Sequence, residues 1–175
     1  MNFDLSEEQR MLESTLDDYL ERECPIPTIR EFYDGDDELH PGVWKGLVEM
    51  GVTGLHLPEA YGGAGLELLD LQCVAERLGY HATPAPFLGH AIAGLAIALG
   101  GSEPQKEQWL PRIASGDALA TIAFAEDESR WQPEEWGRAA DPNGRLTGSR
   151  PWVPAGRSAD IVVVGLSEGR LGLVD

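Results

Sequence analysis

The chain has 175 residues, of which 42% are hydrophobic, so it can build one core of ordinary size. Its formal net charge is −17, which disfavours binding to nucleic acid or to an anionic membrane surface. No apolar run approaches the ~18 residues that a membrane span needs, and the acidic N-terminus shows no signal-peptide pattern. Cys24 and Cys73 lie far apart and outside any metal motif, which suits packing thiols in a reducing, cytoplasmic protein.

The first predicted helix begins after Ser6, since Ser6 and Gln9 have the spacing of a capping box. Pro25 and Pro27 are expected to end this helix, and a short loop with the acidic sequence "DGDDE" (34–38) follows. Apolar residues recur through the helix at helical period: Met11, Leu12, Leu16, Tyr19 and Leu20.

Further helices are expected up to residue 117. Pro41 suits the first turn of a helix over 41–50, and Gly51 suits its C-terminal cap. A glycine-rich loop leads to a helix over 68–78, and a proline-containing bend follows it. The segment 87–101 is apolar on nearly every side, so we expect a buried helix there.

One more helix precedes a change in pattern. Ser102 and Gln105 form a second capping-box pattern, and Gly116 is expected to end the helix that they open. After it, the runs 118–125, 145–153 and 160–166 have β-type composition and are separated by turn signals such as "DPNG". The last run, 169–175, has no visible partner strand.

The predicted fold class is therefore α+β. An all-α helical domain spans 1–117, and the beginning of a β-barrel or sandwich-like domain spans 118–175. A β-region this small needs further strands or a packed partner to be stable. We therefore expect the chain to be incomplete as a functional unit.

Two stretches of the helical part carry a resemblance to a known family. "PGVWKGLVEMGVTGLHLPEAYGGAGL" (41–66) and "GGSEPQKEQWLPRIASGDALATIAFAE" (100–126) resemble, in order and spacing, signatures of the acyl-CoA dehydrogenase family. The resemblance implies a helical domain, a middle β-domain and a C-terminal helical bundle. It also implies an FAD-dependent oxidation of the α,β carbon–carbon bond of an acyl-CoA thioester. The family's glutamate base lies in the C-terminal domain, so neither Glu59 nor Glu126 matches it and no catalytic residue is assigned.

The resemblance also implies flavin-contacting residues. The family's Thr-Glu-Pro segment, which ends the first β-strand, aligns with Ala125, Glu126 and Asp127. Its Gly-x-Lys-x-Trp-Ile-Thr motif aligns with 148–154, where Trp152 takes the position that packs on the isoalloxazine ring, followed by Val153 and Pro154. A hydroxyl is lost at Ala125, and Pro154 lacks both hydroxyl and N–H. Each lost hydrogen bond would weaken FAD binding by about 0.5–1.5 kcal/mol, although backbone N–H groups at 125–127 remain potential donors.

The predicted buried helix is also implied to line the acyl pocket. Residues assigned to this role are Phe87, Leu88, Ala91 and Leu95, and the preceding Pro-x-Pro pattern resembles a subgroup that acts on bulky or steroid side-chain CoA esters. Ordinary core packing is the alternative for all four. None of the histidines has metal-ligand spacing, so no metal site is predicted: His40, His56, His81 and His90.

Three functional hypotheses remain open. The first is an N-terminal portion of an FAD-dependent acyl-CoA dehydrogenase, with an acyl-CoA substrate, an electron-transferring flavoprotein or similar acceptor, and a homo- or hetero-oligomeric assembly. The second, motivated by the altered flavin motifs, is a non-catalytic partner subunit of a heteromeric enzyme. The third is a free-standing helical interaction domain. The five arginines of the second half offer local sites for phosphate, although each by itself suits a solvated surface: Arg130, Arg138, Arg145, Arg150 and Arg157.

Overall fold

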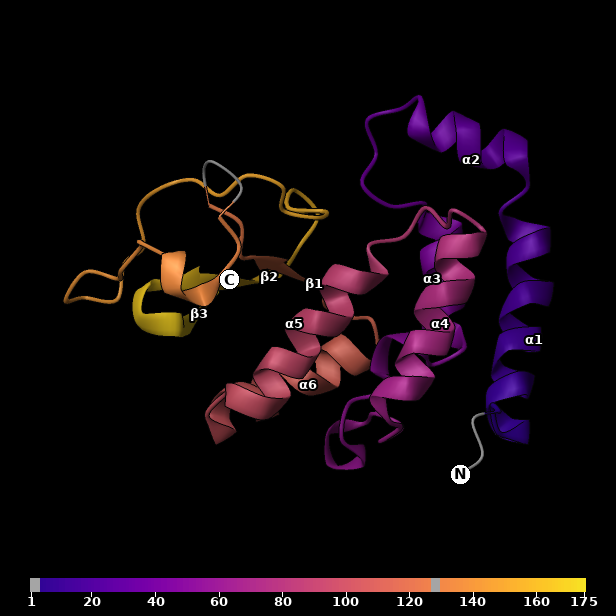
Figure 1. Cartoon of the computed structure of the whole chain (residues 1–175), viewed down its shortest axis with the longest axis horizontal. Coiled ribbons are helices and arrows are strands. Elements are labelled where there is room, and N and C mark those ends of the chain that lie inside the picture. The colour runs from indigo at the N-terminus through magenta and orange to yellow at the C-terminus, as the bar shows by residue number, and fades with distance from the viewer. Residues whose placement is uncertain (1–3, 127–129) are drawn as a thin grey trace.

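The computed structural model describes residues 4–126 and 130–175. The first four helices form one side of the molecule and a small sheet with long loops forms the other, with the last two helices between them (Figure 1). This arrangement confirms the predicted α+β class. The helices are α1 (Glu7–Glu23), α2 (Ile26–Tyr33), α3 (Pro41–Glu49), α4 (Leu68–Tyr80), α5 (Phe87–Gly100) and α6 (Glu103–Ala114).

Both predicted capping boxes are present. The hydroxyl of Ser6 accepts a hydrogen bond from the Gln9 amide at 3.2 Å, and the Gln9 side chain accepts one from the Ser6 amide at 3.0 Å. The Ser102 amide donates to the Gln105 side chain at 2.8 Å. Gly51 has a left-handed backbone, with φ of 73°, directly after α3. These local signals explain why α1, α3 and α6 begin or end where the sequence predicts.

The prediction of a loop directly after α1 was wrong, because α2 forms there. Pro25 occupies the N-cap position of α2 and Pro27 lies in its first turn. The first-turn N–H groups of a helix have no intrahelical acceptor, so proline costs nothing at that position. The two prolines therefore end α1 and also begin α2, and the acidic segment 34–38 follows α2 instead of α1.

The sheet has three strands in the order β1-β2-β3: β1 (Ala120–Ala123), β2 (Ile161–Leu166) and β3 (Arg170–Val174). β1 and β2 run parallel, with Ala120 opposite Ile161. β2 and β3 run antiparallel, with Val162 opposite Val174. The last run of the sequence therefore does have a partner strand, contrary to expectation.

The expected strand over 145–153 does not form. Pro151 removes a backbone donor, and the φ angles of Gly148 (146°) and Trp152 (57°) lie outside the extended region that a ladder needs. The segment belongs instead to the long connection between β1 and β2. This connection carries the second flavin-type motif.

Two apolar clusters form the core. The first joins α1, α3 and α4 to the start of α5. The second joins α5 and α6 to β1 and β2, so the helical part and the sheet share one core across residue 117. Both cysteines are free and buried, as expected for packing thiols. None of the helices in 4–126 and 130–175 is long and apolar enough to cross a membrane.

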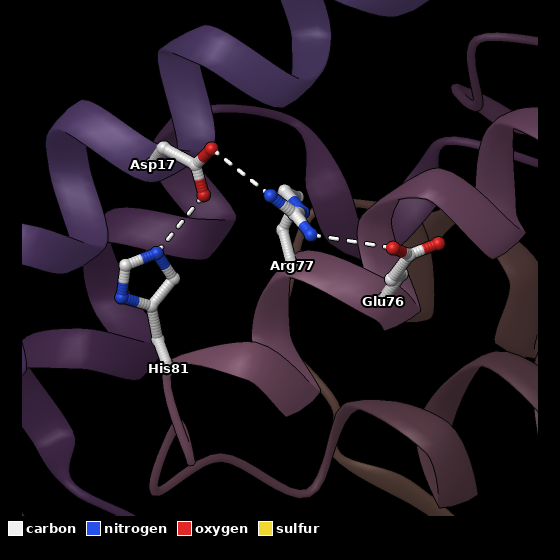
Figure 2. A network of polar contacts seen from close by, with 4 residues as sticks. All are labelled: Asp17, Glu76, Arg77 and His81. Atoms are coloured by element: carbon white, nitrogen blue, oxygen red, sulfur yellow. Dashed lines mark hydrogen bonds and ion pairs between the residues drawn. The ribbon is translucent and has the colours of Figure 1, made fainter.

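A polar network joins α1 to the end of α4. The carboxylate of Asp17 accepts hydrogen bonds from Arg77, at 3.2 Å, and from Nε2 of His81, at 2.9 Å (Figure 2). Arg77 also contacts Glu76 at 3.3 Å. The hydrogen bond to Asp17 raises the pKa of Arg77 above its ordinary value. The network fixes how α1 lies along α4 and is distant in sequence from both flavin-type motifs.

Candidate functional site

An apolar cavity of about 400 Å³ lies where α5 crosses β1, and we call it the α5–β1 cavity. Its walls come from three parts of the chain: the α4–α5 bend with α5, the end of β1, and the long loops between β1 and β2. Every lining residue is apolar or aromatic: Ala85, Pro86, Leu88, Gly89, Ile92, Ile122, Phe124, Ala125, Trp131, Trp152 and Pro154.

The regular spacing of apolar residues along the chain explains the walls formed by α5 and by β1. Leu88 and Ile92 are four residues apart on α5 and therefore share one face of the helix. Ile122 belongs to β1 and Phe124 directly follows its last residue, and at a spacing of two both lie on the same side of the chain, towards the cavity. The two faces meet across the cavity.

A glycine lets these walls approach each other. A Cβ atom at Gly89 would lie 2.9 Å from Oγ1 of Thr121 and 3.4 Å from Cβ of Pro154. The Thr121 hydroxyl in turn donates a hydrogen bond to the carbonyl of Pro154 at 2.6 Å. This contact holds the second motif against β1.

Trp152 forms the outer wall of the cavity with unusual backbone geometry. Its φ is 57°, and Ala155 three residues later has a φ of 48°. Left-handed backbone at a non-glycine residue costs ~1–3 kcal/mol and persists only where surrounding contacts enforce it. The indole is 78% exposed, so a flat face of Trp152 is available beside the apolar lining.

Glu126 does not face the cavity, although Ala125, the preceding residue of the predicted flavin motif, does. Its carboxylate forms an ion pair with Arg150, accepts a hydrogen bond from the Gly137 amide at 2.8 Å, and lies 3.7 Å from Arg130. The hydrogen bond from Arg150 holds the pKa of Glu126 below its ordinary value. The Glu126 amide donates to the Arg130 carbonyl at 2.9 Å, so this N–H is already engaged.

The remaining predicted flavin contacts divide as follows. Ala125, Trp152 and Pro154 line the cavity, whereas the half-buried Val153 packs against Gly156. Asp127 lies outside the described residues. The structure therefore brings three of these residues together around one space.

Of the four predicted acyl-contacting residues, Leu88 alone lines the α5–β1 cavity. Phe87 and Ala91 are buried in the helical core, in line with the core-packing alternative. Leu95 is half-buried on α5, away from the cavity. Phe87 and Leu88 do line a second cavity of about 370 Å³, which shares Ala85 and Leu88 with the first.

His90 lies directly behind the cavity wall and is fully buried. Its Nδ1 accepts from the Ala120 amide at 3.2 Å and its Nε2 donates to the Ile113 carbonyl at 3.2 Å, which is the pattern of a neutral imidazole. Burial lowers the pKa of His90 from 6.5 to about 4. In the part of the chain that the structure describes, no group of histidine, cysteine and acidic side chains could hold a metal ion.

The cavity fits the flat apolar face of a flavin better than its polar edge. Trp131 and Trp152 carry the only side-chain donors in the described lining, their indole N–H groups. Pro154 has no N–H, and its carbonyl is engaged by Thr121. The ring faces therefore have matching walls, while most hydrogen bonds to the ring edge would come from backbone groups or from elsewhere.

Sequence reasoning missed seven cavity residues: Ala85, Pro86, Gly89, Ile92, Ile122, Phe124 and Trp131. The i, i+4 spacing of Leu88 and Ile92, and the alternation of Ile122 and Phe124, are signals that could have identified them. Gly89 offers no such signal, because its role depends on contacts with residues that are distant in sequence.

Comparisons with known proteins agree with the resemblance. The family model described as "Acyl-CoA dehydrogenase, N-terminal domain" matches residues 6–117. A probable acyl-CoA dehydrogenase of Bacillus subtilis (strain 168) is 30% identical over 168 residues, covering 92% of this chain and 28% of that protein.

Solved structures give the same result. The ChsE4-ChsE5 complex from Mycobacterium tuberculosis contains a chain that is 27% identical with a TM-score of 0.86, over 99% of this chain and 48% of that one. An acyl-CoA dehydrogenase complexed with FAD from Bacillus anthracis is 27% identical with a TM-score of 0.75, over 98% of this chain and 32% of that one. The chain thus spans less than half the length of each of these relatives.

Proposed function

Because the chain belongs to the acyl-CoA dehydrogenase family, we propose that it builds one wall of the site of an FAD-dependent enzyme that oxidises the α,β bond of an acyl-CoA thioester. One observation carries the proposal. Ala125, Trp152 and Pro154, expected at flavin, and Leu88, expected at the acyl group, line the same apolar cavity.

The cavity residues have distinct roles in this proposal. The exposed Trp152, together with Ala125 just beyond the end of β1, would hold the flavin ring against the apolar lining. Leu88 and Ile92 exclude water around the acyl group, which strengthens the electrostatic interactions inside the site. Bound FAD would accept the hydride from the β-carbon. No described residue is assigned as the base.

The proposed acyl group is bulky. The α5–β1 cavity, at about 400 Å³, shares Ala85 and Leu88 with the second cavity, at about 370 Å³. An acyl group that extends past Leu88 would contact the apolar walls of both. A polycyclic or long branched acyl group uses this space better than a short linear one.

A second candidate function is a non-catalytic subunit of a heteromeric enzyme. Three of the expected flavin hydrogen bonds are compromised: Ala125 has no hydroxyl, Pro154 has no N–H, and the Glu126 amide is engaged internally. Such a chain would complete a site whose flavin is held mainly by a partner. The similarity to a chain of the two-protein ChsE4-ChsE5 complex supports this reading.

The two candidates differ in a direct test. The protein is purified alone and together with the proteins encoded beside its gene, and each sample is examined for visible flavin absorbance and for acyl-CoA-dependent reduction of an electron acceptor. Flavin and activity in the protein alone support the first function. Flavin and activity only in the complex support the second, and their absence from both samples contradicts both.

A further inference from the structure

The segment between α2 and α3, residues 34–40, contacts the chain close to two walls of the α5–β1 cavity, and we call it the connector. On one side, Glu38 accepts hydrogen bonds from the amides of Arg157 and Ser158, at 2.9 and 2.8 Å, and from the Ser158 hydroxyl at 2.9 Å. The guanidinium of Arg157 adds an ion pair with Glu38 at 3.3 Å and a hydrogen bond to the carbonyl of Asp36. One carboxylate thus organises the loop that directly follows Trp152–Pro154.

On the other side, the connector holds the α4–α5 bend. The His40 amide donates to the Pro84 carbonyl at 2.8 Å. Pro84 directly precedes Ala85 and Pro86, which line the cavity. Glu38 and His40 are two residues apart, so a single short segment fixes the inner wall and the Trp152 wall relative to each other.

Residues 151–158, which we call the Trp152 loop, need such support. The loop contains two non-glycine residues with left-handed backbone, Trp152 and Ala155, on either side of Pro154. Thr121 holds Pro154 from the β1 side. Glu38 holds Arg157 and Ser158 from the helical side. Ala155 therefore lies between the two anchors, and Trp152 lies two residues before the first of them, so both strained residues are close to an anchored position.

We propose that Glu38 is a positioning residue that holds the Trp152 wall of the α5–β1 cavity at its distance from the Pro84–Pro86 wall. It acts through the loop and touches no ligand itself. The effect of Glu38 on ligand binding rests on the proposed function, whereas the effect of Glu38 on the Trp152 loop does not.

The carboxylate suits this role because it is only 19% exposed and stays ionised at neutral pH. Desolvation raises the pKa of Glu38, but the hydrogen bonds from Ser158 and Arg157 outweigh it and hold the pKa below its ordinary value. An uncharged side chain of the same shape replaces it only in part. All three hydrogen bonds end on Oε2, so a glutamine can keep them only by turning its NH2 group towards the Arg157 guanidinium, which loses the ion pair and sets two donors against each other.

The test compares Glu38→Gln with Asp37→Asn. Asp37 is adjacent and exposed and loses the same charge, and its side chain makes no hydrogen bond or ion pair within the described part of the chain. Amide hydrogen exchange of 151–158, the fluorescence of Trp152 (by difference from a Trp152→Phe version of each variant) and the thermal midpoint are measured without ligand. A Ser158→Ala variant, which removes one donor, provides a milder case if Glu38→Gln does not fold.

In Glu38→Gln we expect altered Trp152 fluorescence and little change in the thermal midpoint, with the amides of Arg157 and Ser158 exchanging about tenfold faster because their acceptor loses its charge. Ser158→Ala should change the Trp152 fluorescence less, and Asp37→Asn should match the original protein. Faster exchange at Arg157 and Ser158 with unchanged Trp152 fluorescence, or equal effects of Asp37→Asn, would overturn the proposal.

A ligand titration separates this proposal from the proposed function. The affinity for pristanoyl-CoA, a long branched acyl-CoA used as a probe, should fall in Glu38→Gln and not in Asp37→Asn. If no version binds the probe while the exchange and fluorescence results appear as expected, the proposed function fails and the positioning role of Glu38 stands. If the probe binds all versions equally while Trp152 is displaced, Glu38 does not set the cavity and the proposal is wrong.

Discussion

At the residue scale, Gly89 decides how closely α5 approaches β1. A methyl group there would press on the Thr121 hydroxyl, at 2.9 Å, and would disturb its hydrogen bond to Pro154. We expect Gly89→Ala to lower the free energy of unfolding by ~1–3 kcal/mol, as overpacking does. Urea denaturation measures this change. Gly100, on the same helix with nothing within 4 Å of its added Cβ, provides the control: Gly100→Ala should be neutral or slightly stabilising.

His90 gives a prediction about pH. Its pKa falls from 6.5 to about 4 on folding, so between these values the unfolded chain binds a proton that the folded chain does not. Stability is therefore lost as the pH falls from about 6.5 towards 4, by up to ~3 kcal/mol from this residue. Denaturant unfolding at several pH values should show a smaller acid loss in His90→Gln than in the original protein. Parallel pH profiles would contradict this account.

At the element scale, the network of Figure 2 fixes α1 against α4. Asp17→Asn removes the charge that Arg77 and His81 share, while keeping the shape of the side chain. We expect a loss of ~1 kcal/mol in the free energy of unfolding, because the pair is partly screened by solvent. Asp18→Asn, at the exposed neighbouring position, should have little effect. Equal losses in the two variants would show that the network adds nothing specific.

The elements that could be predicted are those with local signals. Capping boxes and a left-handed glycine mark α1, α3 and α6, and their chemistry is complete within a few residues. α2 escaped prediction because a proline ends one helix and begins another with equal ease. The pairing of β3 and the loss of a strand over 145–153 depend on backbone angles and on partners distant in sequence.

At the scale of the whole molecule, the second core crosses from the helices to the sheet, and the α5–β1 cavity lies on that junction. Motif similarity was sufficient to select Ala125, Trp152 and Leu88, which the structure brings together around one cavity. It was not sufficient to show that Glu126 turns away to Arg150, or that Glu38 reaches the Trp152 loop. Such long-range pairings leave no trace in local spacing. The domain boundary at residue 117 remains a prediction.

The central claim is that the α5–β1 cavity is the binding site. Two exposed leucines of α5 test this claim most directly. Leu88 lies near the start of α5, lines the cavity and is 62% exposed. Leu99 lies near the other end of α5 and is 78% exposed. The measurement is the affinity for acyl-CoA, in the form of the protein that carries flavin, for Leu88→Trp and Leu99→Trp. A tryptophan at 88 fills the cavity, so we predict that affinity falls by about tenfold or more, with Leu99→Trp unchanged. Equal affinity in Leu88→Trp and the original protein would contradict the claim.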